Sequence, residues 1–421
     1  MIDANDMEPQ CTDFKAIQML DGDHLTITWD VGRRCNYSCT YCPPHRHDNF
    51  SGHADMDTLK KSGQFVFDYA ETMMEFKNNK KININFTGGE PTVNPSFLKF
   101  GQWLKDTWKE KYEDQFGLTL TITSNGAFGR KMADNIIDNY GFITVSYHAE
   151  AHANLKKKVI ENIFYLHSKD FPLKVNVMFH AEYWDECIDV CRQLQEADIG
   201  YVPRMIGEHE DSKNSYAHQY TDAQLGWMKG FWKDKNGALN NKPVEAKNTV
   251  EHAAESGTEA SAVKTEKTEE KKMARELGRP CCGSRTMEVC STGSCGTKKA
   301  DTWEKSTFLE FAKFRGWKCS VNWFFLHIEQ QTDTVWHHQT CQARFDGTRG
   351  PIGTLSESHK IIDELRTNMT NKTMPIITCP LGPGKHCGCG LCTPKATSNE
   401  QFKEVFDRHV DTSIFDNTEN F

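Results

Sequence analysis

The stretch that governs the fold is "LTITWDVGRRCNYSCTYCPP", residues 25–44. It begins with a run rich in β-branched and apolar residues, which is typical of a buried parallel strand. Three cysteines follow with the spacing Cys-x3-Cys-x2-Cys, at Cys35, Cys39 and Cys42. Iron–sulfur clusters are held by cysteine thiolates, and four thiolates would saturate a cubane. Three thiolates on one loop therefore predict a [4Fe–4S] cluster in which one iron can bind a small molecule.

The same three cysteines have a second interpretation. A zinc site that borrows a fourth ligand from elsewhere would use the same loop. His45 and His47 follow the loop closely, so they keep this alternative open. The spacing favours the cluster.

Strands of the same kind recur between residues 25 and 205 and alternate with amphipathic stretches. In "GQFVFDYAETMMEF" (63–76), apolar side chains recur at spacings of three and four, which predicts a helix with one buried face. Six strand–helix alternations predict an α/β fold with parallel pairing and right-handed crossovers. We expect a barrel-like, partly open sheet, and periodicity alone leaves a doubly wound sheet as the alternative. The predicted strands are 25–31, 82–86, 118–123, 142–147, 173–179 and 200–205.

Polar residues or glycines stand at the ends of the second, third and fourth strands. The second strand ends in "FTGGEP" (86–91), and paired glycines allow the backbone to approach a ligand closely. The third ends in "TSNG" (123–126) and the fourth in "SYH" (146–148). Because catalytic groups of (β/α) barrels gather at the carboxyl ends of the strands, we expect these motifs to lie around one ligand.

Together these motifs resemble the radical S-adenosylmethionine (SAM) superfamily. The cysteine loop, with the aromatic Tyr41 before its last cysteine, looks like the family signature. "GGEP" is similar to the second-strand motif, and "TSNG" and "SYH" fall where the third and fourth strand motifs lie. The resemblance covers about residues 22–206. It implies a TIM-like, partial (β/α)6 barrel in which SAM binds the unique iron of the cluster.

The resemblance also implies which residues contact SAM. Gly88, Gly89 and Glu90 would hold its amino group, Ser146 would lie near the ribose, and the backbone at Tyr41 would lie against the adenine. Ser124 and Asn125 are expected beside the ligand. The implied chemistry is reductive cleavage of SAM to methionine and a 5′-deoxyadenosyl radical, which abstracts hydrogen from a substrate. The cofactors carry this chemistry, so no separate catalytic acid–base pair is predicted.

Residues 279–396 form a second, cysteine-rich unit, which we expect to be a small α+β domain. Two of its cysteines bracket a predicted β-hairpin, and four more follow late. This pattern resembles the auxiliary-cluster domains called SPASM or twitch, although the inter-cysteine spacings differ from those of the family. It implies at least one auxiliary [4Fe–4S] cluster, with structural zinc as the alternative. The candidate ligands are Cys319, Cys341, Cys379, Cys387, Cys389 and Cys392.

The remaining cysteines receive other interpretations. Cys187 and Cys191 lie at helical spacing and are expected in the core. The group Cys281, Cys282, Cys290 and Cys295 stays open between a further cluster and contact with the substrate.

The composition divides the chain into five parts. Residues 1–21 are an N-terminal extension, and 22–233 hold the barrel. Residues 234–278 consist mainly of Glu, Lys, Ala, Ser and Thr, which predicts a solvated linker or insertion, with an exposed helix as the alternative. The cysteine-rich unit spans 279–396, and 397–421 form a tail.

Charge and hydropathy exclude several classes of function. The net charge of −8 and the lack of a dense basic block argue against general nucleic-acid binding. No run approaches the roughly 18 apolar residues of a membrane span. The polar, acidic N-terminus is unlike a secretory signal, so we expect a cytoplasmic protein. Sixteen cysteines in that compartment indicate metal binding or redox chemistry.

These inferences lead to one leading hypothesis and two alternatives. The leading hypothesis is an oxygen-sensitive radical SAM enzyme that acts on a peptide or protein side chain, with a flavodoxin or ferredoxin as reductant. The first alternative is radical SAM modification of a nucleoside, a sugar or another small metabolite. The second, from another class, is a non-catalytic zinc-binding protein.

Overall fold

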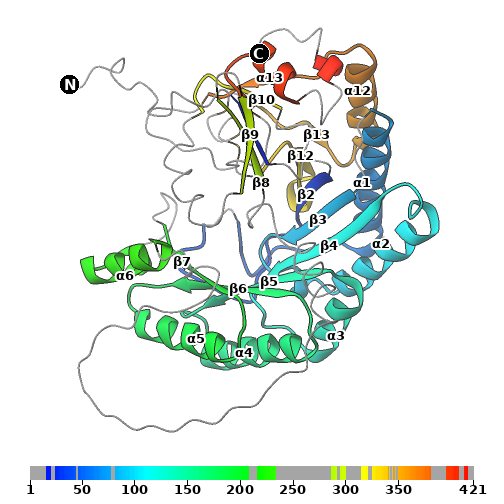
Figure 1. Cartoon of the computed structure of the whole chain (residues 1–421). Coiled ribbons are helices and arrows are strands. Elements are labelled where there is room, and N and C mark those ends of the chain that lie inside the picture. Colours follow the sequence, from blue (N-terminus) through cyan, green and yellow to red (C-terminus); the bar gives the residue numbers. More distant parts are fainter. Residues whose placement is uncertain are drawn as a thin grey trace, which may run out of the picture.

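The computed structural model contains two β-sheets, a large one covered by helices and a smaller one beside it (Figure 1). The predicted linker 234–278 lies outside the described residues, as do five cysteines of the second unit, Cys281, Cys282, Cys387, Cys389 and Cys392. The structure describes residues 16–19, 24–43, 46–76, 81–207, 216–233, 286–291, 294–299, 314–320, 325–339, 341, 344, 347, 349–380, 395–406 and 412–415.

Six parallel strands form one side of the nine-stranded large sheet, and they confirm all six strands predicted from the sequence. Each strand pairs with the next one along the chain, so every crossover runs in the same direction. Crossovers of one hand and one direction place all connecting helices on one face. This order is that of a partial barrel and excludes the doubly wound alternative. The strands are β2 (His24–Asp30), β3 (Lys81–Thr87), β4 (Gly117–Ser124), β5 (Phe142–His148), β6 (Leu173–Phe179) and β7 (Tyr201–Met205).

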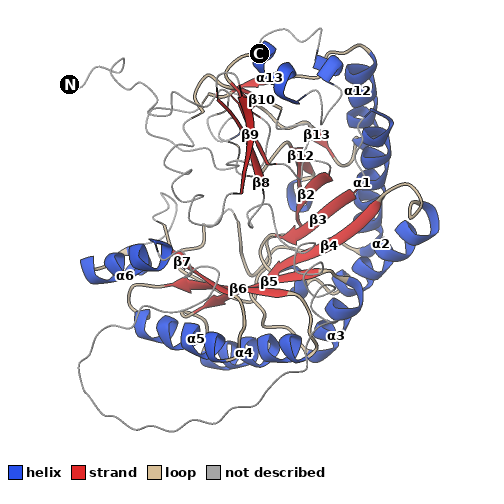
Figure 2. Cartoon of the chain, in the orientation of Figure 1, coloured by secondary structure: helices blue, strands red, loops and turns tan. Residues whose placement is uncertain are grey.

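Helices cover the outer face of this sheet, as Figure 2 shows. The predicted helix is part of α1, where Phe65, Tyr69 and Met73 are buried in the core. In the described part of the chain, no helix is both long and apolar enough to cross a membrane. The helices that follow or connect the strands are α1 (Met56–Phe76), α2 (Phe97–Lys111), α3 (Arg130–Asn139), α4 (Ala153–Ser168), α5 (Trp184–Glu196) and α6 (Asp222–Lys233).

The two faces of the sheet differ in polarity. On β3, Ile82, Ile84 and Phe86 are fully buried in the core. Asn83 and Asn85 alternate with them and therefore point to the opposite, inner face. Thr121 of β4 donates a hydrogen bond to Asn85 there. A polar inner face gives the barrel a surface that can bind a polar ligand.

The large sheet continues past β2 with three strands from the range assigned to the second unit, of which only the first two were expected as strands. β11 (Phe325–Glu329) pairs with β2 in parallel. β12 (Thr334–Trp336) and β13 (Gly353–Thr354) then follow in antiparallel register. The predicted hairpin is therefore present, and it extends the barrel sheet.

The smaller sheet has six strands, all paired antiparallel, in the order β14-β10-β15-β1-β8-β9. One of them, β1, comes from the predicted N-terminal extension and lies between β8 and β15. The strands are β1 (Ala16–Met19), β8 (Thr286–Ser291), β9 (Ser294–Lys299), β10 (Lys318–Cys319), β14 (Ile377–Thr378) and β15 (Lys395–Ala396). This sheet, with α13 (Asn399–Phe406), confirms an additional α+β unit. In contrast, α12 (Ser358–Thr370) packs against α1 and β13 of the larger part.

Candidate cofactor site at the rim of the barrel

The three-cysteine loop leaves the carboxyl end of β2 and is closed at its base. The backbone N–H of Asp48 donates to the carbonyl of Arg33 (2.9 Å), and Cys35 N–H donates to the carbonyl of Asp48 (2.7 Å). The Asp48 carboxylate accepts the backbone N–H of Ser51 (2.7 Å) as well as its hydroxyl. These bonds fix the two ends of the loop, so the cysteines between them project from one anchored base.

The loop carries three free thiols. Cys39 is buried, whereas Cys35 and Cys42 are half-buried. Burial raises the pKa of Cys35 to about 11 and that of Cys39 to about 12, and it also raises the pKa of Cys42. Thiolates are the form that binds iron, so metal binding here must release protons. Three thiols on one closed loop suit an iron–sulfur cluster that retains an open iron.

Two glycines allow the second-strand motif to pack against this loop. Gly89 N–H donates to the carbonyl of Gly32 (2.8 Å). A Cβ on Gly89 would lie 2.2 Å from the carbonyl oxygen of Arg33, and one on Gly88 would lie 2.5 Å from that of Gly32. Gly88 also has a φ of +118°, which side chains rarely adopt. The motif therefore requires glycine at both positions.

Glu90 joins the second strand end to the third. Its buried side chain accepts hydrogen bonds from Ser124 Oγ (2.8 Å) and Asn125 N–H (2.6 Å), and it also accepts from Thr92. Burial raises the pKa of Glu90, and the hydrogen bonds oppose that rise. Three of the four hydrogen bonds reach Oε1, so Oε2 retains capacity to accept a further donor.

Asn125 then joins the third strand end to the cysteine loop. Its side-chain N–H donates to Asn36 Oδ1 (2.6 Å) and lies 3.8 Å from Cys35 Sγ. The adjacent Ser124 is almost completely buried. Residues from three separate motifs are thus in direct contact at one rim.

Tyr41 and His148 join the loop to the end of β5. The Tyr41 hydroxyl lies 2.5 Å from His148 Nδ1, and the two rings are stacked. Burial raises the pKa of Tyr41 well above its usual range, and burial, aided by nearby His47, lowers that of His148 to about 4. The tyrosine is therefore the donor and the neutral histidine the acceptor. Cys39 Sγ lies 3.8 Å from the same nitrogen.

Two further residues complete this end of the sheet. Ser146 is half-buried on β5 and is the register partner of Asn176 on β6. Glu150, just beyond β5, accepts the backbone N–H of Thr40 (2.8 Å) and so holds the cysteine loop. Glu150 and Asp48 were not predicted from the sequence, because carboxylates that accept backbone N–H groups leave no spacing signal.

Three of the predicted auxiliary ligands lie in the described part of the second unit. Cys319 of β10 packs with Ile377 of β14, and the half-buried Cys341 packs against both. Cys379 follows β14, and its N–H donates to the carbonyl of Trp317 (2.8 Å). Whether these cysteines hold iron or zinc stays a prediction. Cys187 and Cys191 are fully buried, which confirms their place in the core.

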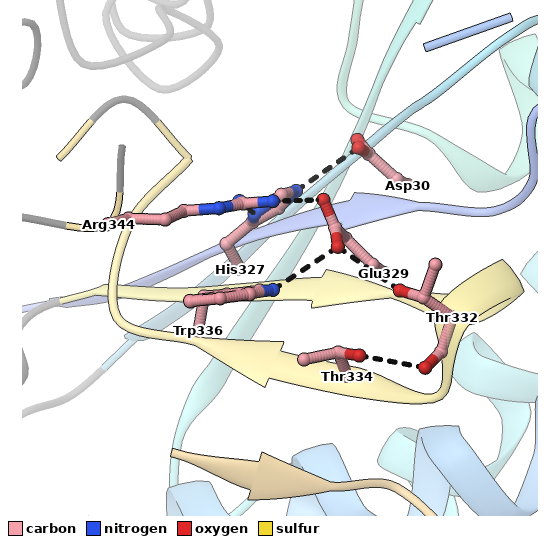
Figure 3. Close-up of polar contacts among 7 residues, drawn as sticks. All are labelled: Asp30, His327, Glu329, Thr332, Thr334, Trp336 and Arg344. Atoms are coloured by element: carbon pink, nitrogen blue, oxygen red, sulfur yellow. Dashed lines mark hydrogen bonds and ion pairs between the residues drawn. The ribbon is translucent and has the colours of Figure 1, made fainter. Parts of the chain in front are cut away.

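A second polar cluster, which was not predicted from the sequence, lies at the ends of β2 and β11 (Figure 3). His327 is almost completely buried, and its Nε2 lies 3.2 Å from Asp30 Oδ2. Its Nδ1 lies 2.7 Å from a nitrogen of Arg344, which also pairs with Glu329. The Arg344 guanidinium lies 4.3 Å from the centre of the Trp336 ring. Although burial raises the pKa of Glu329, Arg344 lowers it below its usual value.

A cavity of about 320 Å³ opens beside this cluster. Gly88 of the predicted SAM motif lines it, so the cavity adjoins the rim described above. The cavity is lined by Asp30, Gly32, Arg33, Arg46, Gly88, His327, Glu329, Gln331, Thr332, Trp336, Gln339 and Arg344.

Comparison with known sequences identifies a family match. Residues 29–197 match the Radical SAM superfamily. One curated relative is the GTP 3′,8-cyclase of Campylobacter fetus subsp. fetus (strain 82-40), which is 27% identical over 203 residues. The matched region covers 45% of this chain and 58% of the cyclase, so this chain spans little more than half the length of that relative.

Comparison with solved structures gives distant similarities. Native anSMEcpe with bound AdoMet and the Cp18Cys peptide is 12% identical, with a TM-score of 0.46. The matched region covers 93% of this chain and 99% of the anSMEcpe chain. A histidine-tagged form of anSMEcpe with bound AdoMet is 15% identical over 45% of this chain and 55% of its own, with a TM-score of 0.36. SuiB of Streptococcus suis is 11% identical over 83% of this chain and 69% of its own, with a TM-score of 0.45.

Proposed function

Because residues 29–197 form a radical SAM domain, we propose that this protein reductively cleaves SAM and abstracts hydrogen from a bound substrate. One observation carries the proposal, namely the convergence of three strand-end motifs on one loop. Glu90 binds Ser124 and Asn125, and Asn125 in turn contacts the segment that begins at Cys35. A structural zinc loop would need none of these contacts.

The proposed cofactor contacts follow from this arrangement. Cys35, Cys39 and Cys42 would hold a [4Fe–4S] cluster. When bound, the cluster supplies the electron that converts SAM to methionine and a 5′-deoxyadenosyl radical, which takes a hydrogen atom from the substrate. The residues proposed to contact SAM are Tyr41, Gly88, Gly89, Glu90, Ser124, Asn125 and Ser146.

The residues of the chain position these groups and control their protonation. The base closed by Asp48 and the contact from Glu150 hold the cysteine loop from both sides. Neutral His148 orients the Tyr41 ring by accepting a hydrogen bond from its hydroxyl. Each buried thiol remains protonated until a metal displaces its proton, which makes cluster binding favour higher pH.

The substrate is proposed at the level of chemical class. A peptide or protein side chain is the first candidate, because the second unit resembles auxiliary-cluster domains. A specific observation favours the second candidate, a nucleoside, sugar or other small metabolite. The cavity beside Gly88 has a volume of about 320 Å³ and a polar, charged lining, which suits a small polar molecule. The cyclase relative is likewise named for a nucleotide.

Three further features belong to the proposal. At least one auxiliary iron–sulfur cluster would be held by cysteines of the second unit. Cys319 and Cys341 are the first candidates, because both belong to one small packed group with Ile377. A flavodoxin or ferredoxin would supply electrons. The protein would act in the cytoplasm, where such reductants and reduced thiols are found.

The test is an anaerobic assay. The protein is reconstituted with iron and sulfide, incubated with SAM and dithionite, and analysed for 5′-deoxyadenosine. A Cys35/Cys39/Cys42→Ala triple variant is run beside Cys187→Ala, which removes a buried cysteine elsewhere in the barrel. Deoxyadenosine from wild type and Cys187→Ala alone supports the proposal. No deoxyadenosine from wild type with a full iron complement refutes it.

A further inference from the structure

Two adjacent buried polar atoms beside the barrel rim make no hydrogen bond with any described residue. They are Asp30 Oδ1 and His327 Nε2. Nε2 lies 3.2 Å from the other carboxylate oxygen, Oδ2, but it is not aligned for a hydrogen bond. Buried polar atoms are nearly always hydrogen-bonded, because leaving one unsatisfied costs free energy. Two such atoms side by side therefore indicate a place where a ligand binds.

The chemistry of these two atoms is fixed by Arg344. A guanidinium group only donates hydrogen bonds, so His327 Nδ1 must be the acceptor of the 2.7 Å contact. The proton of the neutral imidazole is then on Nε2. The site consequently offers an N–H donor from His327 and an acceptor oxygen from Asp30, next to each other.

This arrangement argues against a metal ion. Ligand atoms of Asp30, His327 and Glu329 do lie within 4.8 Å of one another, which is compatible with a cation. A metal needs a free nitrogen lone pair, yet one nitrogen of His327 carries the proton and the other accepts from Arg344. The positive charge of Arg344 would also repel the ion. Figure 3 shows Arg344 and His327 in this contact.

A hydroxyl group is the natural complement of the site. It can donate to Asp30 Oδ1 and accept from His327 Nε2–H at the same time. Two arginines of the cysteine-loop segment, Arg33 and Arg46, line the same cavity. Among the residues that line the cavity, Glu329 balances the charge of Arg344. The two positive charges of Arg33 and Arg46 then exceed the single negative charge of Asp30.

We propose that this cavity binds a small anion that carries a hydroxyl group, such as a hydroxy acid or a sugar phosphate. The hydroxyl lies between Asp30 and His327, and the anionic group lies toward Arg33 and Arg46. This inference rests on the proposed function, because Gly88 lines the cavity and would place the bound molecule beside SAM. It makes Asp30 and His327 substrate-binding residues, and Arg344 the residue that positions His327.

Binding of four probes to the reconstituted protein tests the inference without any radical chemistry. Glycerol 3-phosphate is compared with propyl phosphate, and glycerate with propionate, by anaerobic calorimetry. In each pair, only the first molecule carries hydroxyl groups on its carbon chain. We expect at least one hydroxylated anion to bind about tenfold more tightly than its partner. A preference within the first pair indicates a phosphate ligand, and a preference within the second pair indicates a carboxylate ligand.

Two variants separate the two halves of the site. Asp30→Asn replaces the carboxylate with a weaker, neutral acceptor and should remove most of the preference for the hydroxylated probe. The affinity for its partner should not fall, because the change also removes a negative charge beside the bound anion. Arg46→Gln, at an exposed position, should weaken every anion about tenfold and keep the preference. Asp106→Asn, on the exposed surface of α2, serves as the control and should behave like wild type. Circular dichroism checks that each variant is folded.

Three results would overturn the inference. They are the absence of binding by all four probes, an unchanged hydroxyl preference in folded Asp30→Asn, and displacement of the bound probe by SAM. The last result would assign the cavity to SAM itself. Failure here is distinguishable from failure of the proposed function, because the binding assay involves no SAM cleavage and the deoxyadenosine assay is run without substrate.

Discussion

The hydroxyl of Tyr41 donates a hydrogen bond of 2.5 Å to Nδ1 of His148, which connects the cysteine loop to the end of β5. Both residues are half-buried, and the same histidine nitrogen lies 3.8 Å from Cys39. Because Tyr41 stands between Cys39 and Cys42 in the sequence, this one bond orients the part of the loop that carries two predicted cluster ligands.

Removing either partner of this bond should lower SAM cleavage. We expect Tyr41→Phe and His148→Ala each to reduce kcat/KM for SAM by roughly fivefold in the substrate-free deoxyadenosine assay, which corresponds to about 1 kcal/mol for one hydrogen bond. The kcat/KM of the double variant should equal that of the less active single variant, because both changes break the same interaction. Multiplicative losses would show that the two residues act independently.

Replacing Gly89 by alanine should disrupt the junction between the loop and the second strand. The added Cβ would lie 2.2 Å from the backbone carbonyl of Arg33, and backbone cannot move aside cheaply. We expect a loss of about 2 kcal/mol or more in the free energy of unfolding and a lower iron content after reconstitution. Gly129→Ala is the matched control, because nothing lies within 4 Å of its new Cβ. Urea denaturation with equal losses in both variants would contradict the prediction.

Acidification should destabilise the apoprotein through His148. Its pKa is lowered from 6.5 to about 4 by burial, so the folded state resists the proton that the unfolded state accepts. The stability that depends on neutral His148 is therefore fully present above pH 6.5, and it is lost as the pH falls from 6.5 toward 4. We expect a loss on the order of 2 kcal/mol between about pH 7.5 and pH 5, measured by urea denaturation. His148→Leu should reduce this pH dependence, whereas the exposed-site variant His359→Gln should retain it.

Removing the carboxylate at the base of the cysteine loop should impair cluster retention. Asp48 accepts hydrogen bonds from Ser51 and from the backbone N–H of Phe50, and its backbone closes the loop. We expect Asp48→Ala to lose about 1 kcal/mol of stability and to release iron to a chelator several times faster than wild type. Asp106→Ala provides the comparison. Identical release rates would mean that the backbone bonds alone hold the loop.

Much of the barrel could be predicted from the sequence because its signals are local. Each run of β-branched residues that forms one of the strands β2 to β7 is continuous in the sequence. The cysteines Cys35, Cys39 and Cys42 lie within one short segment. The parallel pairing of β11 with β2 was not predictable in this way. Thr28 is the register partner of His327, and nothing near either residue signals a partner so distant in the sequence.

The polar cluster near Asp30 was missed for the same reason. His327 and Glu329 alternate with buried apolar residues, as polar residues do on any half-buried strand. Only the pairing of β11 with β2 brings His327 and Glu329 close to Asp30. Only the tertiary fold brings Arg344 into contact with His327 and Glu329. Asp48 and Glu150 were missed because carboxylates are common in loops, and their backbone partners carry no side-chain signature.

The position of β11 also has a consequence for biosynthesis. Trp29 donates a side-chain hydrogen bond to Gln330, and 301 residues separate the two along the chain. When a ribosome has synthesised β2 to β7, the outer edge of β2 still lacks the strand that will cover it. Unpaired edges of this kind recruit strands from other chains. The last third of the polypeptide thus protects the first barrel strand from aggregation, and nascent chains that stall before residue 325 carry that edge exposed.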